Sequence, residues 1–488
     1  MGDDTELRYA SASRLATDIR NGTRTSAAVV DAFLDRIDQR NDTVKAFITV
    51  TAERARAAAR EADEAVRRGE DLGPLHGVPV ALKDLYGYKR GVRHTFGSKP
   101  FADHVPDEDA IFVERLETAG AIVLGKTNTP EFGSQGTCDN RLFGPTVTPF
   151  ALGHTAGGSS GGSAAALADG MAPLATGSDI GGSLRIPASA CGVYGFKPSF
   201  GLVPHAFRPN AFEAHTPFLT VGPLARTVED AALVLDVVAG PSRRDPFSVP
   251  KPGESFRSAL DRDVSRVRVA YTPSLDLFPV SDSVRAVARN TVATVEQCVA
   301  SVERVPIDLG FTREELREAG RIQLEVAYAS LAEGIERRYG YDLTGDDATD
   351  LTDTFRELVE AGTERSAVEY KRSDFVRTRV FDAIQRVFDA YDLLLVPTLA
   401  VPPFEVDTEG PSEVAGVSVD PWWDLYLTWL FNWGDFPAAS IPAGQTSDGL
   451  PVGMQLVGPR LTDDRVLAVS ATLERVAPWD ETYPEVTE

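Results

Sequence analysis

The sequence predicts an α/β fold in which helices cover both sides of a central mixed β-sheet. Short apolar runs, which are typical of buried strands, alternate with longer stretches in which apolar side chains recur at helical spacing. No repeat of fixed period and no clear linker divides the chain. We therefore expect one large domain over residues 1–488, with residues 284–390 as a mainly helical addition to it.

Helices and strands alternate in the first part of the chain. Residues 25–40 carry apolar side chains along one helical face, and Thr25 or Ser26 is placed to cap the first turn. Residues 77–83, Gly-Val-Pro-Val-Ala-Leu-Lys, indicate a buried strand that ends on a lysine. The other elements expected here are strand 46–50, helix 51–69, helix 110–118 and strand 121–124.

The second half of the chain is predicted to be mostly helical. Residues 228–239 have the pattern of an amphipathic helix, and residues 312–338 and 353–390 are the longest helical stretches after it. Residues 391–396, Tyr-Asp-Leu-Leu-Leu-Val, indicate a buried strand. Four of the five tryptophans then fall within residues 422–433.

The net charge of −23 is the most unusual property of the composition. It argues against direct contact with nucleic acid, because phosphates need basic partners. Of the 49 basic residues only 8 are lysine. An acidic, lysine-poor surface suits a protein from a halophile, since concentrated salt screens the self-repulsion. An ordinary acidic protein is the alternative.

The sequence offers no feature of a membrane protein or a metalloprotein. No apolar stretch reaches the roughly eighteen residues that a membrane span needs, and the acidic start lacks the basic and apolar parts of a signal peptide. This predicts a cytoplasmic protein. The three cysteines are widely spaced, and the six histidines show no metal-ligand spacing. We expect neither a metal nor another cofactor.

Two Gly/Ser segments stand out, GGSSGGS at 157–163 and DIGGSLR at 179–185. Such segments are often flexible linkers. Here, however, the first one runs directly into the alanine-rich residues 164–168, a predicted helix that Ser159 or Ser160 is placed to cap. A glycine-rich approach to a helix brings backbone N–H groups close to a bound group. No Gly-Lys-Ser/Thr follows, which excludes a P-loop.

Other nucleophilic mechanisms fit the sequence less well. Residues 157–161 match the GxSxG elbow of α/β hydrolases, but that elbow requires a later histidine and none follows His215. The SxxK segment 248–251 contains a proline that disrupts the helix such enzymes need. Cys191 lies in an apolar run, which favours a buried small residue over a nucleophile.

The two serine segments resemble those of the amidase signature family, serine amidohydrolases with one large α/β domain. The strongest part of the resemblance is GGSSGGS together with residues 177–198, GSDIGGSLRIPASACGVYGFKP. It extends over nearly the whole chain, to GVPVALKD at 77–84, GKTNTPEF at 125–132, VGPLARTV at 221–228, FPAASIPAG at 436–444 and GLPVGMQLVG at 449–458. Residues 77–204 would then form the catalytic core segment.

The resemblance implies a Ser–Ser–Lys triad in which Ser183 is the nucleophile, Ser159 the bridging serine and Lys83 the base. It also implies a cis peptide bond between Gly158 and Ser159. The backbone N–H groups expected to form the oxyanion hole belong to Ile180, Gly181, Gly182 and Ser183, and the residues expected to support the site are Gly158, Ser160, Asp179 and Arg185.

Simple chemistry agrees with this assignment. A serine hydroxyl needs a base, and a lysine serves as one only when its pKa falls from about 10.4 through burial. Lys83 ends an apolar strand, which suits such a shift. Asp84 would oppose it, but neighbours on a strand point to opposite faces. A binding module with an inactive site is the non-enzymatic alternative, and the presence of all three triad residues argues against it.

The expected reaction is hydrolysis of a carboxylic amide through an acyl-enzyme on Ser183. The alternative is the glutaminase subunit of a Glu-tRNA(Gln) amidotransferase, whose sequences usually have SLDQIGP where this chain has TPFLTVGP at 216–223; this difference favours a free-standing amidase. Trp423, Phe431 and Asn432 are candidates for an apolar substrate pocket, with a core position as the equal alternative. The expected partner is a small-molecule amide, and a homodimer is left open.

Overall fold

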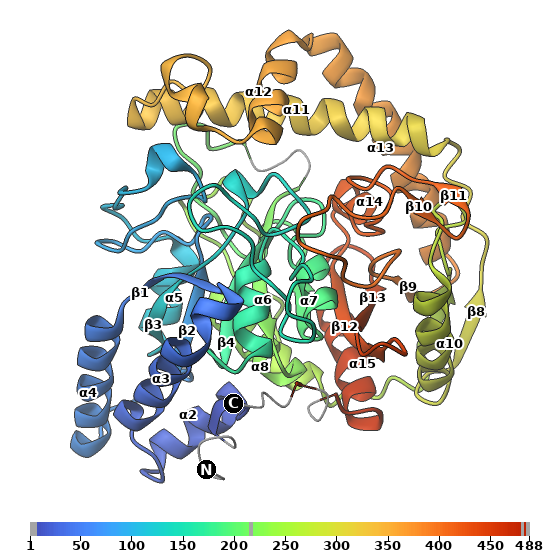
Figure 1. Ribbon diagram of the computed structural model, residues 1–488. Helices are drawn as coiled ribbons and strands as arrows, with labels where there is room; N and C mark the ends of the chain where they lie inside the picture. The colour runs from blue at the N-terminus through green and yellow to red at the C-terminus, as the bar shows by residue number, and fades with distance from the viewer. Residues whose placement is uncertain (1–6, 214–217, 480–482, 485–488) are drawn as a thin grey trace.

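The computed structural model describes residues 7–213, 218–479 and 483–484 (Figure 1). Within them, eleven strands form one mixed sheet in the order β1-β3-β2-β4-β6-β5-β12-β13-β9-β7-β8. The strands are β1 Phe47–Val50, β2 Pro79–Lys83, β3 Ile122–Thr127, β4 Leu174–Asp179, β5 Tyr194–Lys197, β6 Thr220–Ala225, β7 Arg268–Tyr271, β8 Ser301–Arg304, β9 Leu393–Pro397, β12 Ala438–Gln445 and β13 Pro451–Val457. A separate pair consists of β10 Glu413–Val414 and β11 Val417–Ser418.

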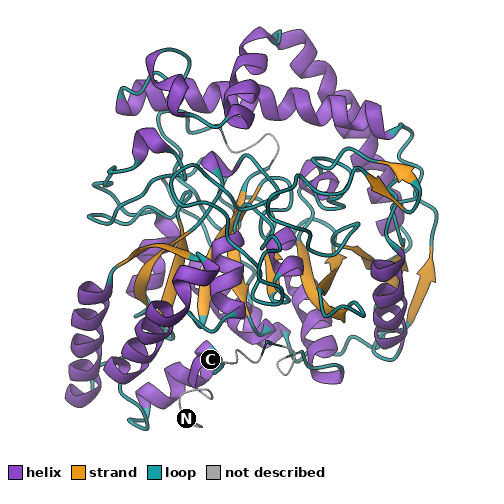
Figure 2. Ribbon diagram, viewed as in Figure 1, coloured by secondary structure: helices purple, strands orange, loops and turns teal. Residues whose placement is uncertain are grey.

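Helices lie on both sides of this sheet, as Figure 2 shows. They are α2 Ala12–Arg20, α3 Ser26–Val44, α4 Ala52–Arg68, α5 Ile111–Thr118, α6 Gly161–Ala168, α7 Arg185–Ala190, α8 Val228–Val238, α9 Phe256–Ala259, α10 Asp282–Glu296, α11 Arg313–Tyr339, α12 Asp353–Glu364, α13 Ala367–Phe388, α14 Trp429–Trp433 and α15 Asp463–Val476. The α/β fold with a mixed central sheet is therefore confirmed. The predicted strands at 46–50, 77–83, 121–124 and 391–396 correspond to β1, β2, β3 and β9.

The sheet combines two parallel groups with an antiparallel centre. Strand β2 runs parallel to both β3 and β4, and β7 runs parallel to β8 and β9. The strands between them, β6, β5, β12 and β13, pair antiparallel. Because β2 and β4 are parallel neighbours, their carboxyl ends meet at one edge of the sheet, which brings the residues that end these strands together.

Helices α11, α12 and α13 lie together as a layer above this edge (Figure 1). A capping box of Thr312 and Glu315 starts α11. The sequence predicted one helix over 353–390, but the structure has two, because Arg365 adopts an extended conformation and the Ser366–Glu369 capping box starts α13 anew.

The sheet buries most of its apolar side chains against the surrounding helices. Residues 29, 30, 33 and 37 of α3 are buried, and Thr25 is the N-cap. Strand β8 lies inside the stretch 284–390 and forms one edge of the main sheet. In the described part of the chain, no helix is both long and apolar enough to cross a membrane.

Candidate active site

Lys83 is the last residue of β2 and is almost completely buried. Its Nζ lies 2.6 Å from Oγ of Ser159 and 2.9 Å from Oγ of Ser178. Ser178 belongs to the neighbouring parallel strand β4, and this pairing brings it level with the end of β2. The lysine thus has two neutral hydroxyl groups as hydrogen-bond partners.

Burial lowers the pKa of Lys83 to about 7, because the ammonium form loses its hydration. The electrostatic influence of Cys138 and Asp179 opposes this shift only in part. A substantial fraction of the side chain is therefore a neutral amine near pH 7, which is the form that accepts a proton.

Asp84 lies on the other face of the strand, as the alternation of side chains predicts. Its Oδ2 accepts hydrogen bonds from the backbone N–H and the hydroxyl of Thr95, and its Oδ1 lies 3.2 Å from Nδ1 of His94. Burial raises the pKa of Asp84 to about 6. This carboxyl group makes no hydrogen bond with Lys83.

Ser159 and Ser160 precede α6, and the peptide bond between Gly158 and Ser159 is cis. Ser160 occupies the N-cap position, yet its hydroxyl does not cap the helix as the sequence suggested. Instead its Oγ lies 3.4 Å from both the backbone nitrogen and the carbonyl oxygen of Ser178. Ser160 therefore links the loop before α6 to strand β4.

Ser183 precedes α7 and is 7% exposed. It lines one cavity together with Ser159, Ser178 and Ile180. Of the three residues of the predicted triad, Lys83 and Ser159 are therefore in direct contact, and Ser183 lines the same cavity as Ser159.

The backbone around Ser183 departs from the prediction at one group. The N–H of Gly182 donates to Oδ1 of Asp179 over 2.7 Å, so it is already engaged. The N–H groups of Ile180, Gly181 and Ser183 have no hydrogen-bond acceptor among the described residues. Three of the four N–H groups predicted for the oxyanion hole are therefore not engaged by another group of the described residues.

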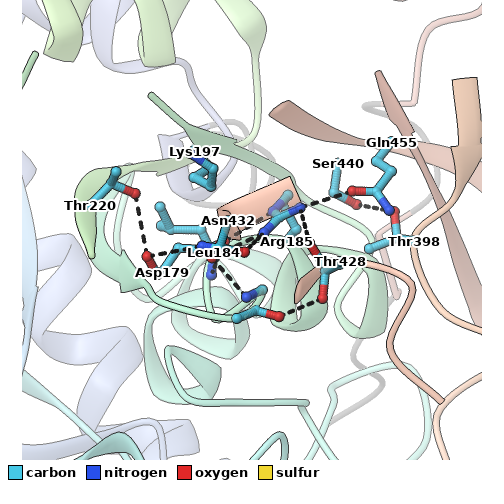
Figure 3. A network of polar contacts seen from close by, with 12 residues as sticks. Asp179, Leu184, Arg185, Lys197, Thr220, Thr398, Thr428, Asn432, Ser440 and Gln455 are labelled. Carbon is cyan, nitrogen blue, oxygen red and sulfur yellow. Dashed lines mark hydrogen bonds and ion pairs between the residues drawn. The ribbon is translucent and has the colours of Figure 1, made fainter. Parts of the chain in front are cut away.

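A buried network holds the 179–185 segment in place (Figure 3). Nε and Nη2 of Arg185 each lie 3.0 Å from an oxygen of Asp179, and both side chains are fully buried. Burial raises the pKa of Asp179, but the charge and hydrogen bonds of Arg185 outweigh it and leave the pKa at about 2. The carboxylate remains ionised and also accepts from the N–H of Leu184.

Helix α14 and strand β13 supply the rest of this network. Asn432 bonds both members of the ion pair, with Oδ1 accepting from Arg185 at 2.7 Å and Nδ2 donating to Asp179 at 2.8 Å. Arg185 also donates to Oε1 of Gln455 and to the carbonyl of Thr428. The hydroxyl of Thr428 donates to the carbonyl of Gly181. Segments distant in sequence thereby fix the backbone beside Ser183.

The cavity at the serines is mainly apolar and aromatic. Its walls come from the loop after β2, the short turn at 131–133, residues 207, 213 and 219, and helix α11. Beyond the two serines, Ser178 and Ile180, the lining residues are Leu85, Tyr86, Phe132, Gly133, Phe207, Glu213, Leu219, Ala327, Tyr328 and Leu331. A second cavity adjoins it and shares six of these residues.

The three candidate pocket residues do not line either cavity. Phe431 is completely buried in the core, and Asn432 belongs to the polar network around Arg185. Trp423 packs edge-to-face against Trp429 and borders a different cavity. The tryptophans therefore pack in the core around α14. The expectation that they line a substrate pocket at the serines is wrong.

Sequence reasoning missed Ser178, Gln455, Thr428 and Gly133. Ser178 and Gln455 lie within the segments that resemble the family, but their roles depend on strand pairing and side-chain direction. Gly133 has φ +75°, and a Cβ there would lie 3.2 Å from Oγ of Ser159. In the sequence, Gly133 is only a glycine that follows the matched segment 125–132, and this does not reveal that it lies close to Ser159.

The described residues contain no group of three or more His, Cys, Asp or Glu side chains that could hold a metal ion. Cys191, the alternative nucleophile, is buried, and burial raises the pKa of its thiol. It lines neither of the two cavities at the serines.

Comparison with known proteins gives a consistent answer. The chain is 36% identical to the acylamidase of Rhodococcus erythropolis, over 98% of both chains. It is 34% identical to a glutamyl-tRNA(Gln) amidotransferase subunit of Carboxydothermus hydrogenoformans, over 99% of this chain and all of that one. Among solved structures, a bacterial aryl acylamidase of the amidase signature family matches with a TM-score of 0.93 at 35% identity, over 97% of this chain and 98% of that one.

The Amidase family profile matches residues 28–467, nearly the whole chain. The fold, the serine segments and these similarities agree. The protein belongs to the amidase family and is an amidohydrolase, an enzyme that hydrolyses carboxylic amide bonds.

Proposed function

We propose that the hydrolysis proceeds through an acyl-enzyme on Ser183, with Ser159 and Lys83 transferring its proton. The 2.6 Å contact between Lys83 and Ser159 is the observation that carries this proposal. Neutral Lys83 accepts the proton of Ser159 as Ser159 takes the proton of Ser183, and the Ser183 oxygen attacks the amide carbonyl. The proton then returns through Ser159 to the departing amine, and water releases the acid from Ser183.

The developing oxyanion is bound by the N–H groups of Ile180, Gly181 and Ser183. Such donors contribute most when the backbone is held in place before the reaction. The Asp179–Arg185 pair and Asn432 provide that rigidity, since they fix the turn from both ends. These side chains act as positioning groups that do not touch the substrate.

We propose a free-standing amidase whose substrate is a small aryl or alkyl amide. The aromatic and apolar lining of the cavity suits such a substrate, and the similarity to an acylamidase and an aryl acylamidase supports it. The second candidate is the glutaminase subunit of a tRNA-dependent amidotransferase, favoured by the 34% identity to such subunits. The sequence difference at 216–223 argues against it, although residues 216 and 217 lie outside the described residues.

We further propose that the enzyme is cytoplasmic, belongs to a halophile, and contacts neither nucleic acid nor a membrane. The charge of −23 and the shortage of lysine support this setting. Sedimentation in molar KCl would decide between a monomer and a homodimer.

The experiment is an assay of amine or ammonia release from acetanilide, benzamide, phenylacetamide and glutamine in molar KCl. Ser183→Ala should abolish turnover and the trapping of an acyl group on the protein by mass spectrometry. Ser163→Ala is the matched control, since its hydroxyl bonds Thr127 and the carbonyl of Thr176 and is not among the hydrogen-bond partners of Lys83; it should keep turnover. Activity that survives in Ser183→Ala overturns the nucleophile, and activity on glutamine alone supports the amidotransferase reading.

A further inference from the structure

Tyr328 brings a phenol hydroxyl to the cavity that contains Ser159 and Ser183. Helix α11 lies above the edge of the sheet at which the serines are found (Figure 1), and it contributes Ala327, Tyr328 and Leu331 to the cavity wall. Tyr328 is the only one of these three residues with a polar side-chain group. A substrate that fills the cavity from the serines to α11 therefore contacts Tyr328.

The hydroxyl of Tyr328 has no hydrogen-bond partner within residues 7–213, 218–479 and 483–484. The side chain is 8% exposed, but its oxygen is not among the completely enclosed polar atoms, so it is accessible from the cavity that Tyr328 lines. The ring packs edge-to-face against Phe355 of α12, with the ring centroids 5.5 Å apart, and this contact holds it in place. A nearly buried hydroxyl without a partner costs free energy. A ligand that supplies the partner removes this cost.

The chemistry of the wall favours an uncharged acceptor as that partner. Burial raises the pKa of Tyr328, so its hydroxyl stays protonated at physiological pH and can donate one hydrogen bond. The neighbouring lining residues Ala327, Leu331 and Phe132 are apolar. A neutral oxygen acceptor enters such surroundings at a smaller desolvation cost than an anion.

We infer that Tyr328 is a specificity-determining residue that favours amides with an uncharged carbonyl oxygen at the end of the molecule remote from the scissile bond. Its hydroxyl donates a hydrogen bond to this oxygen when the scissile carbonyl lies at Ser183. A site with a buried donor discriminates against a substrate of similar shape that lacks the acceptor, because the donor then stays unpaired. This inference rests on the proposed reaction at Ser183 and narrows its class of substrate.

The test uses two pairs of substrates in which an acetyl group replaces an isopropyl group of similar size. In one pair the group lies on the acyl part: 4-acetylbenzamide and 4-isopropylbenzamide. In the other it lies on the amine part: N-acetyl-4-acetylaniline and N-acetyl-4-isopropylaniline. The quantity compared is the ratio of kcat/KM for the acetyl compound to kcat/KM for the isopropyl compound, measured with wild type and with Tyr328→Phe.

We expect this ratio to be roughly three- to tenfold higher in wild type than in Tyr328→Phe for one of the two pairs, as one neutral hydrogen bond provides. Because both proteins receive the same two substrates, the different intrinsic reactivities of the amides cancel in the comparison. A change in turnover that affects both compounds equally cancels as well.

Tyr426→Phe is the matched control. Tyr426 is 7% exposed, and in the described part of the chain its hydroxyl also has no hydrogen-bond partner, but it borders the separate cavity beside Trp422. This variant removes the same group from a similar environment away from the serines. It should keep the wild-type ratio for both pairs.

Urea unfolding gives a second readout. Because no described residue bonds the Tyr328 hydroxyl, Tyr328→Phe should be at least as stable as wild type. A clearly less stable variant would show that the folded chain itself uses this hydroxyl and would overturn the inference.

Three kinetic results would also overturn it: equal ratios in wild type and Tyr328→Phe for both pairs, an equal decrease in Tyr426→Phe, or no turnover of the four compounds by an enzyme that hydrolyses benzamide. Failure of the proposed nucleophile is distinguishable from these results, since it appears as turnover by Ser183→Ala.

Discussion

The Nζ of Lys83 lies 2.6 Å from Oγ of Ser159, and both side chains are almost fully buried. A lysine so placed contacts hydroxyl groups where a structural lysine would contact carboxylates. This difference decides its chemistry, because neutral partners leave the cost of burying the ammonium uncompensated and lower the pKa to about 7.

The activity should follow the titration of this lysine. The neutral fraction of a group with a pKa near 7 increases about tenfold between pH 6 and pH 8. We therefore expect kcat/KM for a neutral amide to rise about tenfold over this range and to level off above it. A pH–rate profile measured with benzamide checks this, and a profile that is flat or falling between pH 6 and pH 8 would contradict Lys83 as the base.

The lowered pKa of Lys83 should also make the stability of the protein depend on pH, because burying the ammonium form destabilises the folded chain. The pKa of Lys83 is lower in the folded chain than in the unfolded one, so the unfolded chain binds more protons between about pH 7 and pH 10, and stability rises with pH there. Lys83→Met lacks this dependence. Between pH 7 and pH 9, the free energy of unfolding of wild type should therefore increase by about 2 kcal/mol relative to that of Lys83→Met.

Urea unfolding of both proteins at the two pH values measures that difference. Because Lys126 and all other titrating groups are common to both proteins, their contributions cancel in the comparison. A difference between the two proteins that does not change with pH would show that folding leaves the pKa of Lys83 unshifted.

Breaking the buried ion pair of Asp179 and Arg185 should strongly lower the free energy of unfolding. Asp179→Asn leaves the guanidinium buried without its carboxylate, which costs roughly 3–5 kcal/mol of stability. It also replaces one of the two oxygens that accept from the N–H groups of Gly182 and Leu184, so one of these groups loses its acceptor and activity should fall as well. Glu333→Gln breaks the exposed pair with Arg337 and should change stability by less than about 1 kcal/mol. Similar losses in the two variants, measured by urea unfolding, would contradict a structural role for the buried pair.

Salt should stabilise the protein. A net charge of −23 favours expansion through self-repulsion, and this repulsion is screened over about 3 Å at 1 M salt against about 10 Å at 0.1 M. We expect the Tm to rise between 0.1 M and 2 M KCl. An equal increase in NaCl would assign the effect to screening and not to one particular cation, and a constant Tm would contradict a high-salt setting.

The local elements of this fold could be predicted because their signals are local. Strand β2 ends on Lys83 as its apolar run indicated, and α3 begins after Thr25 as its cap indicated. The division between α12 and α13 was missed because helical periodicity continues through it, while the capping box at Ser366 that starts the second helix is a subtler signal.

The site was predictable only in part for a related reason. Ser159 and Ser183 lie in glycine-rich segments whose composition is conspicuous, whereas Ser178 is defined by the pairing of β4 with β2. Asn432 was expected to line the substrate pocket but bonds Arg185 instead, a contact between distant segments that the sequence does not show. The tryptophans misled since aromatic residues suit a pocket and a core equally well.

Gly133 should be required for space and not only for its backbone conformation. Its φ of +75° disfavours any other residue, and a Cβ there would lie 2.6 Å from Cδ2 of Leu85 and 3.2 Å from Oγ of Ser159. Gly22 has a similar φ of +73° but nothing within 4 Å of the added Cβ. The two alanine variants therefore share the backbone cost of about 1–2 kcal/mol, and only Gly133→Ala crowds the bridging serine.

We expect Gly133→Ala to lower kcat for benzamide at least about tenfold more than Gly22→Ala, because small displacements of a reacting group strongly reduce the rate. Steady-state kinetics with both variants, together with their urea unfolding curves, separates the two effects. Equal kinetics at equal stability would show that Ser159 tolerates a displacement, and it would then be a poor candidate for the group that passes the proton between Ser183 and Lys83.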